Sequence, residues 1–184
     1  MRSNKDRLYI ALYARGGTPT MPGLEDKYHW ALIVGPKRES NVSRGHRFHA
    51  MEKLSSVGSL PKAQSVWQYE SLEIPMAPKS MLLVRIVVGK VKNMSRLRAI
   101  LDATPVRPEV RGWNCVEWVR EALQAAIRDG RALGASAGDW KSVRDTTMRF
   151  VERKKAAHRF DGSRSYDSTK AATWDMLTKT ELVP

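Results

Sequence analysis

The chain has 184 residues, of which 42% are hydrophobic and 28% charged, with one cysteine and a net charge of +13 at pH 7. These proportions are typical of a folded domain and exclude a disordered chain. A lone cysteine excludes both an internal disulfide and a zinc site built from cysteines, and it favours a reducing, cytoplasmic setting. The polar residues 1–7 do not resemble a signal peptide, and we expect no transmembrane segment.

The basic charge leaves two classes of function open. A positive surface attracts phosphates, nucleic acids and anionic lipid heads, with or without a specific site. The chain is therefore either an enzyme with a basic surface or a module that binds an anionic partner.

The first half of the sequence predicts β-strands. Residues rich in strand formers occupy 7–14, 28–36, 47–52, 66–74 and 81–91, and most of these runs end at glycine or proline. Strands that follow one another through short loops favour an antiparallel meander.

Helical patterns follow the strands. We expect helices over about 93–103, over 114–129, and from Asp139 or Ser142 to about residue 157. The third helix has an apolar face formed by Val143, Thr147, Phe150 and Val151. The predicted fold class is α+β, with helices packed on one side of the sheet.

Two regions are expected within the chain. Residues 1–157 form a single domain, and residues 158–184 form a basic, polar tail that is extended or partly disordered. Trp174 and Leu177 are the side chains with which this tail docks onto the domain.

The segment around Cys115 is the strongest candidate for chemistry. A loop rich in helix breakers ends at Trp113, and Asn114 is a favourable N-cap residue for the helix that follows. Cys115 then lies in the first helical turn, where the helix dipole favours a thiolate. The alternative interpretation is a small buried core residue.

A cysteine nucleophile needs a base and a group that orients the base. His29 and His49 lie on predicted strands that can be neighbours in the sheet, which suggests His29 as base and His49 as orienting residue. His46 is a weaker third candidate, because strand alternation places it on the face opposite His49. Two carboxylates are alternatives for the orienting role, Glu52 and Glu70.

Three short blocks resemble one known group of proteins. Tyr28–Gly35 (YHWALIVG), Phe48–Ala50 (FHA) and Trp113–Val119 (WNCVEWV) are similar, in this order, to the signature blocks of the lecithin–retinol acyltransferase and phospholipase A/acyltransferase group. That group is a permuted branch of the NlpC-type papain-like superfamily. The resemblance implies a permuted papain-like fold and an acyl-enzyme on Cys115, with His29 as general base and His49 orienting it.

The resemblance covers residues 28 to about 124 and is limited to these blocks. The C-terminal region is polar and basic, where membrane-active members of the group usually carry a hydrophobic anchor. The sequence Val116-Glu117-Trp118 also replaces the Glu-His-Phe that often follows their Asn-Cys pair, and both differences point away from a phospholipid substrate. The opening Leu8–Tyr13 further resembles fungal proteins of unassigned function.

Several neighbouring side chains are candidates for the substrate pocket or the oxyanion site. These are Tyr28, Trp30, Trp113 and Asn114, with core packing as the alternative role for the aromatic residues. The backbone N–H of Cys115 is the expected oxyanion donor. No metal or organic cofactor is implied.

The sequence thus predicts a thiol hydrolase or acyltransferase acting on an ester, thioester or amide, including the variant in which the thiol condenses or cyclises an acyl chain. The expected partner is an acyl-bearing small molecule, lipid or peptide. The alternative is an inactive papain-like module that binds nucleic acid or another anionic partner. The basic side chains considered for that role are Lys141, Arg144, Arg149, Arg153, Lys154, Lys155 and Arg159.

Overall fold

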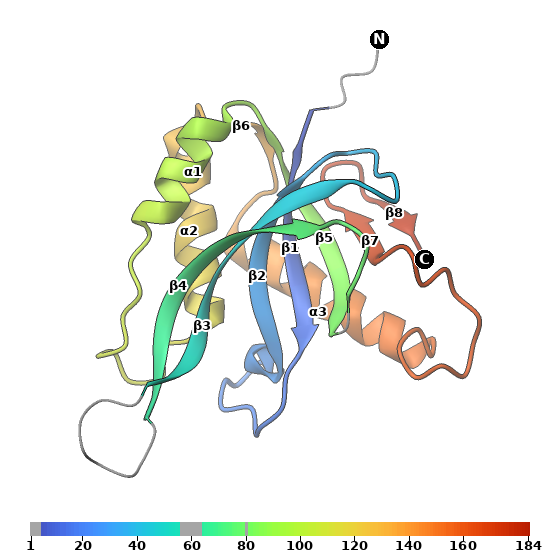
Figure 1. The fold of residues 1–184 in the computed structure, drawn as a ribbon, viewed down its shortest axis with the longest axis horizontal. Coiled ribbons are helices and arrows are strands. Elements are labelled where there is room, and N and C mark those ends of the chain that lie inside the picture. Colours follow the sequence, from blue (N-terminus) through green and yellow to red (C-terminus); the bar gives the residue numbers. More distant parts are fainter. Residues whose placement is uncertain (1–4, 56–63, 80) are drawn as a thin grey trace.

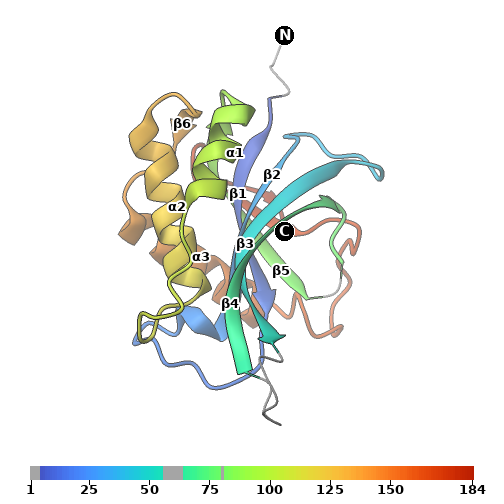
Figure 2. The same cartoon turned by 60° about the vertical axis from the view of Figure 1, so that its left-hand side comes forward.

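A mixed, mostly antiparallel sheet of eight strands forms the centre of the computed structural model, which describes residues 5–55, 64–79 and 81–184. Three helices pack on one face of this sheet, and Figures 1 and 2 show the two layers. The predicted α+β class is confirmed.

The first four strands form the predicted meander. They are β1 (Arg7–Ala14), β2 (Tyr28–Gly35), β3 (Arg44–Ser55) and β4 (Gln64–Pro75), and neighbours are antiparallel. A short 3-10 helix, η1 (Glu25–Lys27), precedes β2. The loop expected between β3 and β4 lies largely in residues 56–63, outside the described part of the chain.

The fifth strand closes the meander on its other side. β5 (Leu82–Val91) pairs antiparallel with β1, so the order through these strands is β4-β3-β2-β1-β5. Strands β1, β2 and β5 are therefore interior, which explains why apolar residues fill both of their faces. The short strand β6 (Leu133–Ser136), which the sequence pattern did not predict, pairs with β5.

The C-terminal region contributes to the sheet. β7 (Ala172–Asp175) pairs parallel with β5, and β8 (Thr180–Val183) pairs with β7. The structure thus differs from the expected extended tail, because residues 172–183 add two hydrogen-bonded strands. Trp174 packs against the core on the helix side of the sheet, and Leu177 packs against the apolar cluster on the opposite face.

The three helices begin where capping residues predict. α1 (Met94–Ala103) is capped by Asn93, α2 (Cys115–Asp129) by Asn114 and α3 (Trp140–Ala156) by Asp139. The four predicted apolar positions of α3 are all buried. In the part of the chain that the structure describes, no helix has the length and apolarity needed to cross a bilayer.

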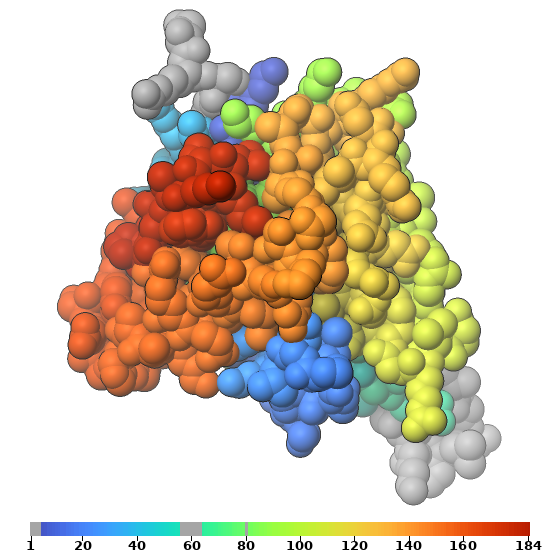
Figure 3. Space-filling view, turned by 180° about the vertical axis from the view of Figure 1, so that it is seen from behind, coloured from blue at the N-terminus to red at the C-terminus, as the bar shows by residue number. Residues whose placement is uncertain are grey.

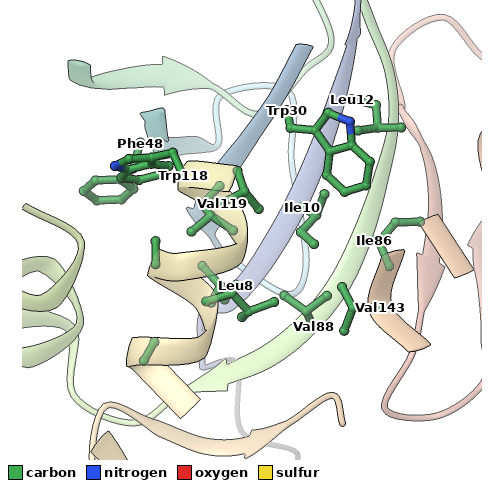
Figure 4. Packing of buried hydrophobic residues seen from close by; sticks show 14 of the residues in the cluster. Leu8, Ile10, Leu12, Trp30, Phe48, Ile86, Val88, Trp118, Val119 and Val143 are labelled. Carbon is green, nitrogen blue, oxygen red and sulfur yellow. The ribbon is translucent and has the colours of Figure 1, made fainter. Parts of the chain in front are cut away.

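The main core lies between the helices and the sheet. Figure 4 shows Leu8, Ile10 and Leu12 of β1 in contact range of side chains from α2, α3 and the neighbouring strands. Trp30 of β2 and Trp118 of α2 are both fully buried in this core. The packing fixes α2 against the sheet, and with it the position of Cys115.

Candidate active site

The start of α2 is held by its cap. The Asn114 side-chain oxygen accepts hydrogen bonds from the backbone N–H of Val116 at 2.9 Å and of Glu117 at 3.4 Å. At the other end of α2, Gly130 ends the helix in the left-handed conformation, with φ of 69°. Cys115 is consequently the first residue of α2, as the sequence predicted.

The Cys115 sulfur lies where β2 and β3 part. Pairing between these strands covers Leu32–Val34 of β2, so the preceding residues of β2 have no partner on β3. The backbone N–H of Trp30 instead donates to Cys115 Sγ, with an N···S distance of 3.5 Å. Because a strand N–H points within the plane of its sheet, the sulfur occupies the opening between the strands, next to the backbone of His29.

The Cys115 side chain is a thiol, whereas the sequence predicted a thiolate. Cys115 is 0% exposed, and burial raises the pKa of its thiol above the ordinary value. The Trp30 amide, the charge of Arg15 and the amides of Cys115 and Val116 each lower this pKa, but by less than burial raises it. The resting group is a neutral thiol, because the loss of solvation outweighs the effect of the helix start.

Two histidines and a carboxylate form a hydrogen-bonded chain beside this opening. His29 Nε2 lies 2.7 Å from His49 Nδ1, and His49 Nε2 lies 3.3 Å from Glu70 Oε1. His49 and Glu70 are directly opposite each other in the pairing of β3 with β4. Lys53 also donates to Glu70, and that hydrogen bond is the largest cause of the lowered pKa of the Glu70 carboxyl.

The ionised carboxylate fixes the tautomers of both rings. Glu70 can only accept, so His49 carries its proton on Nε2 and uses Nδ1 as an acceptor. His29 then carries its proton on Nε2 and donates to His49. His29 Nδ1 is left unprotonated, which is the state that a general base requires.

Both imidazoles are neutral at physiological pH. Burial, followed by the charge of His49, lowers the pKa of His29 to about 3. Burial, followed by the charge of Arg47, lowers the pKa of His49 to about 4, although Glu70 acts in the opposite direction. The site therefore holds a neutral thiol and neutral imidazoles rather than a thiolate–imidazolium pair.

A cavity of about 350 Å³ opens at this end of the sheet. His29 and His49 line it from one side of the β2–β3 opening. Trp67 lines it too and makes an edge-to-face contact with Trp113, at a centroid distance of 5.8 Å, just before the start of α2. Residues from both faces of the sheet thus line the cavity, whereas Cys115 is fully buried and is not among its lining residues. Its full lining is Tyr13, Ala14, Arg15, His29, Arg47, His49, Met51, Glu52 and Trp67.

The three predicted catalytic residues are near one another but not all in contact. His29 and His49 are hydrogen-bonded, and the ring of His29 lies 6.0 Å from that of Tyr13 on the face opposite the helices. Cys115 belongs to the core on the helix side. Among the hydrogen bonds of the described residues, none joins the sulfur to either imidazole; its partner is the Trp30 amide.

The other predicted pocket residues lie outside the cavity. Tyr28 points away from the imidazoles and donates from its hydroxyl to Glu152 at 2.5 Å. The Trp30 indole donates to the carbonyl of Glu25 at 2.8 Å within the core. Trp113 supports the cavity wall through Trp67. Asn114, which is 6% exposed, acts as the helix cap.

His46 and Glu52, two other candidates for the orienting role, bind residues other than His29 and His49. His46 lies on the helix face of β3, beside Phe48, and its Nε2 is 2.9 Å from the Ser71 hydroxyl. Glu52 pairs with Arg15 at 3.7 Å rather than with a histidine. Glu70 is thus the carboxylate that contacts the histidine pair.

Arg15, Arg47 and Trp67 are among the cavity residues that the sequence did not single out. Arg15 lies with its guanidinium 5.7 Å from the centre of the Trp67 ring, and Arg47 lies 5.5 Å from that of Tyr13. Trp67 and Arg47 alternate with core residues on ordinary strands, so no local pattern marks them. The pairing of β3 with β4 brings them to the cavity.

The basic residues of the α3 region do not form one stripe. Lys154 is 7% exposed and pairs with Glu181 of β8. Lys141 pairs with Asp145, and Arg144 pairs with both Glu25 and Asp145. Many of these charges are neutralised locally, Arg149 and Lys155 line different cavities, and Arg159 donates to backbone carbonyls of the C-terminal region.

A metal site is not apparent in the described ranges, where no three His, Cys, Asp or Glu side chains form a group that could hold an ion.

Comparison with curated proteins and with solved structures found no match. A family model does match residues 5–183, nearly the whole chain. The chain therefore belongs to DUF6914, a family of unknown function.

Proposed function

We propose that this protein is a thiol hydrolase or acyltransferase that forms an acyl-enzyme on Cys115. The observation that carries the proposal is the oriented chain Glu70–His49–His29, which leaves His29 Nδ1 free to accept a proton beside the backbone position that holds the sulfur. The resemblance of the His-Trp, His and Asn-Cys blocks to the lecithin–retinol acyltransferase group supports the same assignment and a permuted papain-like fold.

The reaction proceeds from the neutral pair. Substrate entry into the cavity moves the sulfur from the Trp30 amide to His29 Nδ1, which requires a new side-chain rotamer of Cys115. Hydrogen bonds of this kind commonly tighten only when the substrate is bound. His29 then removes the thiol proton as the sulfur attacks the acyl carbonyl, which avoids a free thiolate in a buried site.

Acyl transfer to Cys115 forms one bond and breaks another. The S–C bond forms, the bond from the carbonyl carbon to the leaving group breaks, and His29 returns the proton to the leaving group. Water or a second acceptor then cleaves the thioester. The amides of Trp30 and Cys115, which lower the pKa of the thiol, also suit the stabilisation of developing negative charge, whereas the Val116 amide donates to the Asn114 cap.

The experiment uses a p-nitrophenyl ester and intact mass spectrometry of the folded protein. We expect a single acyl adduct on Cys115 that is absent from Cys115→Ala. Loss of a general base typically slows such a step by about 10²–10⁴-fold, so His29→Ala should form the adduct far more slowly.

Strand β3 offers a matched control. His49→Ala should slow acylation, whereas His46→Ala removes an imidazole from the same strand, on the helix face, and should leave the rate unchanged. Acylation at equal rates in wild type and His29→Ala would overturn the assignment of the base. An adduct that persists in Cys115→Ala would overturn the nucleophile.

A second candidate function is a non-catalytic module that binds an anionic partner. Two observations favour it: the complete burial of Cys115 and the net charge of +13. This module would be retained on nucleic acid in a salt-dependent manner. Neutralising Arg149 and Lys155 would weaken that retention and Cys115→Ala would not; retention unaffected by the charge changes would contradict it.

A further inference from the structure

A second cavity lies at the seam between α3 and the C-terminal strands, away from Cys115. Figure 3 shows these two parts of the chain adjoining on the rear face of the molecule. The seam is cross-linked by Glu181 of β8, which pairs with Arg153 at 2.9 Å and also with the buried Lys154. The walls of this cavity are therefore fixed by ion pairs between the two elements.

The cavity has a volume of about 390 Å³, within the range of small-molecule sites. Its lining contains three cations and no acidic side chain, whereas the cavity beside His29 includes the carboxylate of Glu52. The lining residues are Ser142, Thr146, Arg149, Phe150, Arg153, Trp174, Met176 and Lys179.

Two of the three cations are available to a ligand. Arg149 and Lys179 are exposed, and neither has an ion pair with any residue in the described segments. Lys179 has a positive φ of 55° in the turn between β7 and β8. Asp175 holds that turn by accepting from the backbone N–H of Leu177 at 2.8 Å. The position of Lys179 is thus set by the backbone.

The inner wall is aromatic. The rings of Phe150 and Trp174 lie 6.1 Å apart, and the guanidinium of Arg153 lies 5.2 Å and 5.4 Å from their respective centres. Met176 adds a polarisable thioether to the lining. A flat apolar group gains contact area on such a wall, while an attached anion reaches the cations at the rim.

We propose that this cavity binds a small aromatic anion, with its ring against Trp174 and Met176 and its phosphate or carboxylate between Arg149 and Lys179. A nucleoside monophosphate has this chemistry and size. The site is independent of the proposed acyl-transfer function, because none of its lining residues contributes to the cavity beside His29.

Isothermal titration of the full chain tests the site with three probes: adenosine monophosphate, adenosine and inorganic phosphate. We expect saturable binding of the monophosphate with an affinity at least about tenfold above that of either fragment, since ring and anion contribute separately. Absence of saturable binding, or phosphate binding as tightly as the monophosphate, would overturn the proposal.

Variants then locate the bound molecule. Arg149→Ala and Lys179→Gly should each weaken monophosphate binding by about tenfold or more, which is typical for loss of one charge-assisted contact. Glycine is chosen at residue 179 because it accepts the positive φ without strain. Trp174→Phe should weaken the monophosphate and leave phosphate binding unchanged.

Lys155→Ala is the matched control. It removes an exposed cation from the same helix, but this side chain lines a different cavity. We expect its monophosphate affinity to equal that of the wild type. An equal loss in Lys155→Ala and Arg149→Ala would show only nonspecific attraction to a basic surface and would overturn the assigned site.

Discussion

The hydrogen bonds of the half-buried His29 and the buried His49 depend on both rings being neutral. His49 is 3% exposed and makes hydrogen bonds through both ring nitrogens, to His29 and to Glu70. Protonation of either ring places a cation beside the other imidazole and near the guanidinium of Arg47. The chain of hydrogen bonds that leaves His29 Nδ1 unprotonated is therefore sensitive to acid.

The stability of the protein should fall on acidification. The pKa values of His29 and His49 in the folded state are about 3 and about 4, below the unfolded value of about 6.5. Between the folded and the unfolded pKa values, the unfolded chain binds more protons than the folded protein. The contribution of the two histidines to the free energy of unfolding is therefore complete above pH 6.5, and it is lost as the pH falls toward their folded pKa values. The slope is at most about 1.4 kcal/mol per pH unit for each histidine.

Urea unfolding between pH 7 and pH 4 measures this dependence. The double variant His29→Gln/His49→Gln should show a shallower loss of unfolding free energy over the same range, because glutamine does not titrate. An unchanged slope in the double variant would mean that other groups cause the acid sensitivity.

At this scale, sequence reasoning succeeded where the determinants are local. The cap at Asn114 and the helix start at Cys115 depend on neighbouring residues, and both are present. The choice of Glu70 over Glu52 depends on the register of β3 with β4, which no short pattern encodes. The pKa of the thiol depends on packing against β2, so the expected thiolate was wrong for the resting structure.

Helix starts are the elements on which the site depends most. α2 and α3 are each capped by one side chain, Asn114 and Asp139, and each cap accepts a backbone N–H at 2.9 Å. Cap residues of this kind typically contribute about 1 kcal/mol. The two helices therefore provide a matched comparison, because only α2 carries the candidate nucleophile.

Asn114→Ala and Asp139→Ala should each lower the free energy of unfolding by about 1 kcal/mol, measured by urea denaturation. Only Asn114→Ala should alter acylation of Cys115, because it loosens the first turn of α2 next to the sulfur. An equal change of acylation in both variants would indicate a general loss of stability rather than a local effect on the site.

The sequence predicted the longer elements well and the short ones poorly. Long apolar runs mark β1, β2 and β5, and apolar residues at helical spacing mark the three helices. By contrast, β6, β7 and β8 contain four residues each, and their pairing depends on contact with β5 or with each other. Segments this short carry too little periodicity to separate a strand from a polar loop.

The molecule as a whole depends on its last residues. β7 covers the edge of β5 and forms four parallel residue pairs with it, from Val84–Ala172 to Val87–Asp175. Thr173 and Asp175 are 4% exposed, so this strand is part of the interior. The family match to residue 183 agrees with a domain that includes this hairpin.

A chain truncated after Gly162 should be strongly destabilised and prone to associate through the exposed edge of β5. Size-exclusion chromatography and thermal unfolding measure both effects. Leu182→Ser is the control, because it removes a side chain of β8 that is 47% exposed and leaves the strand pairing intact. A truncated chain that remains monomeric with an unchanged Tm would contradict this role of the hairpin.

The parallel pairing of β5 with β7 also has a consequence for biosynthesis. Translation proceeds from the N-terminus, so β5 leaves the ribosome long before residues 172–175, and one border of the nascent sheet stays uncovered until those residues emerge. Domains generally fold as units, and uncovered strand edges promote misassembly in the meantime. Ribosome-bound intermediates of this chain are therefore expected to need chaperone protection until β7 has emerged and paired with β5.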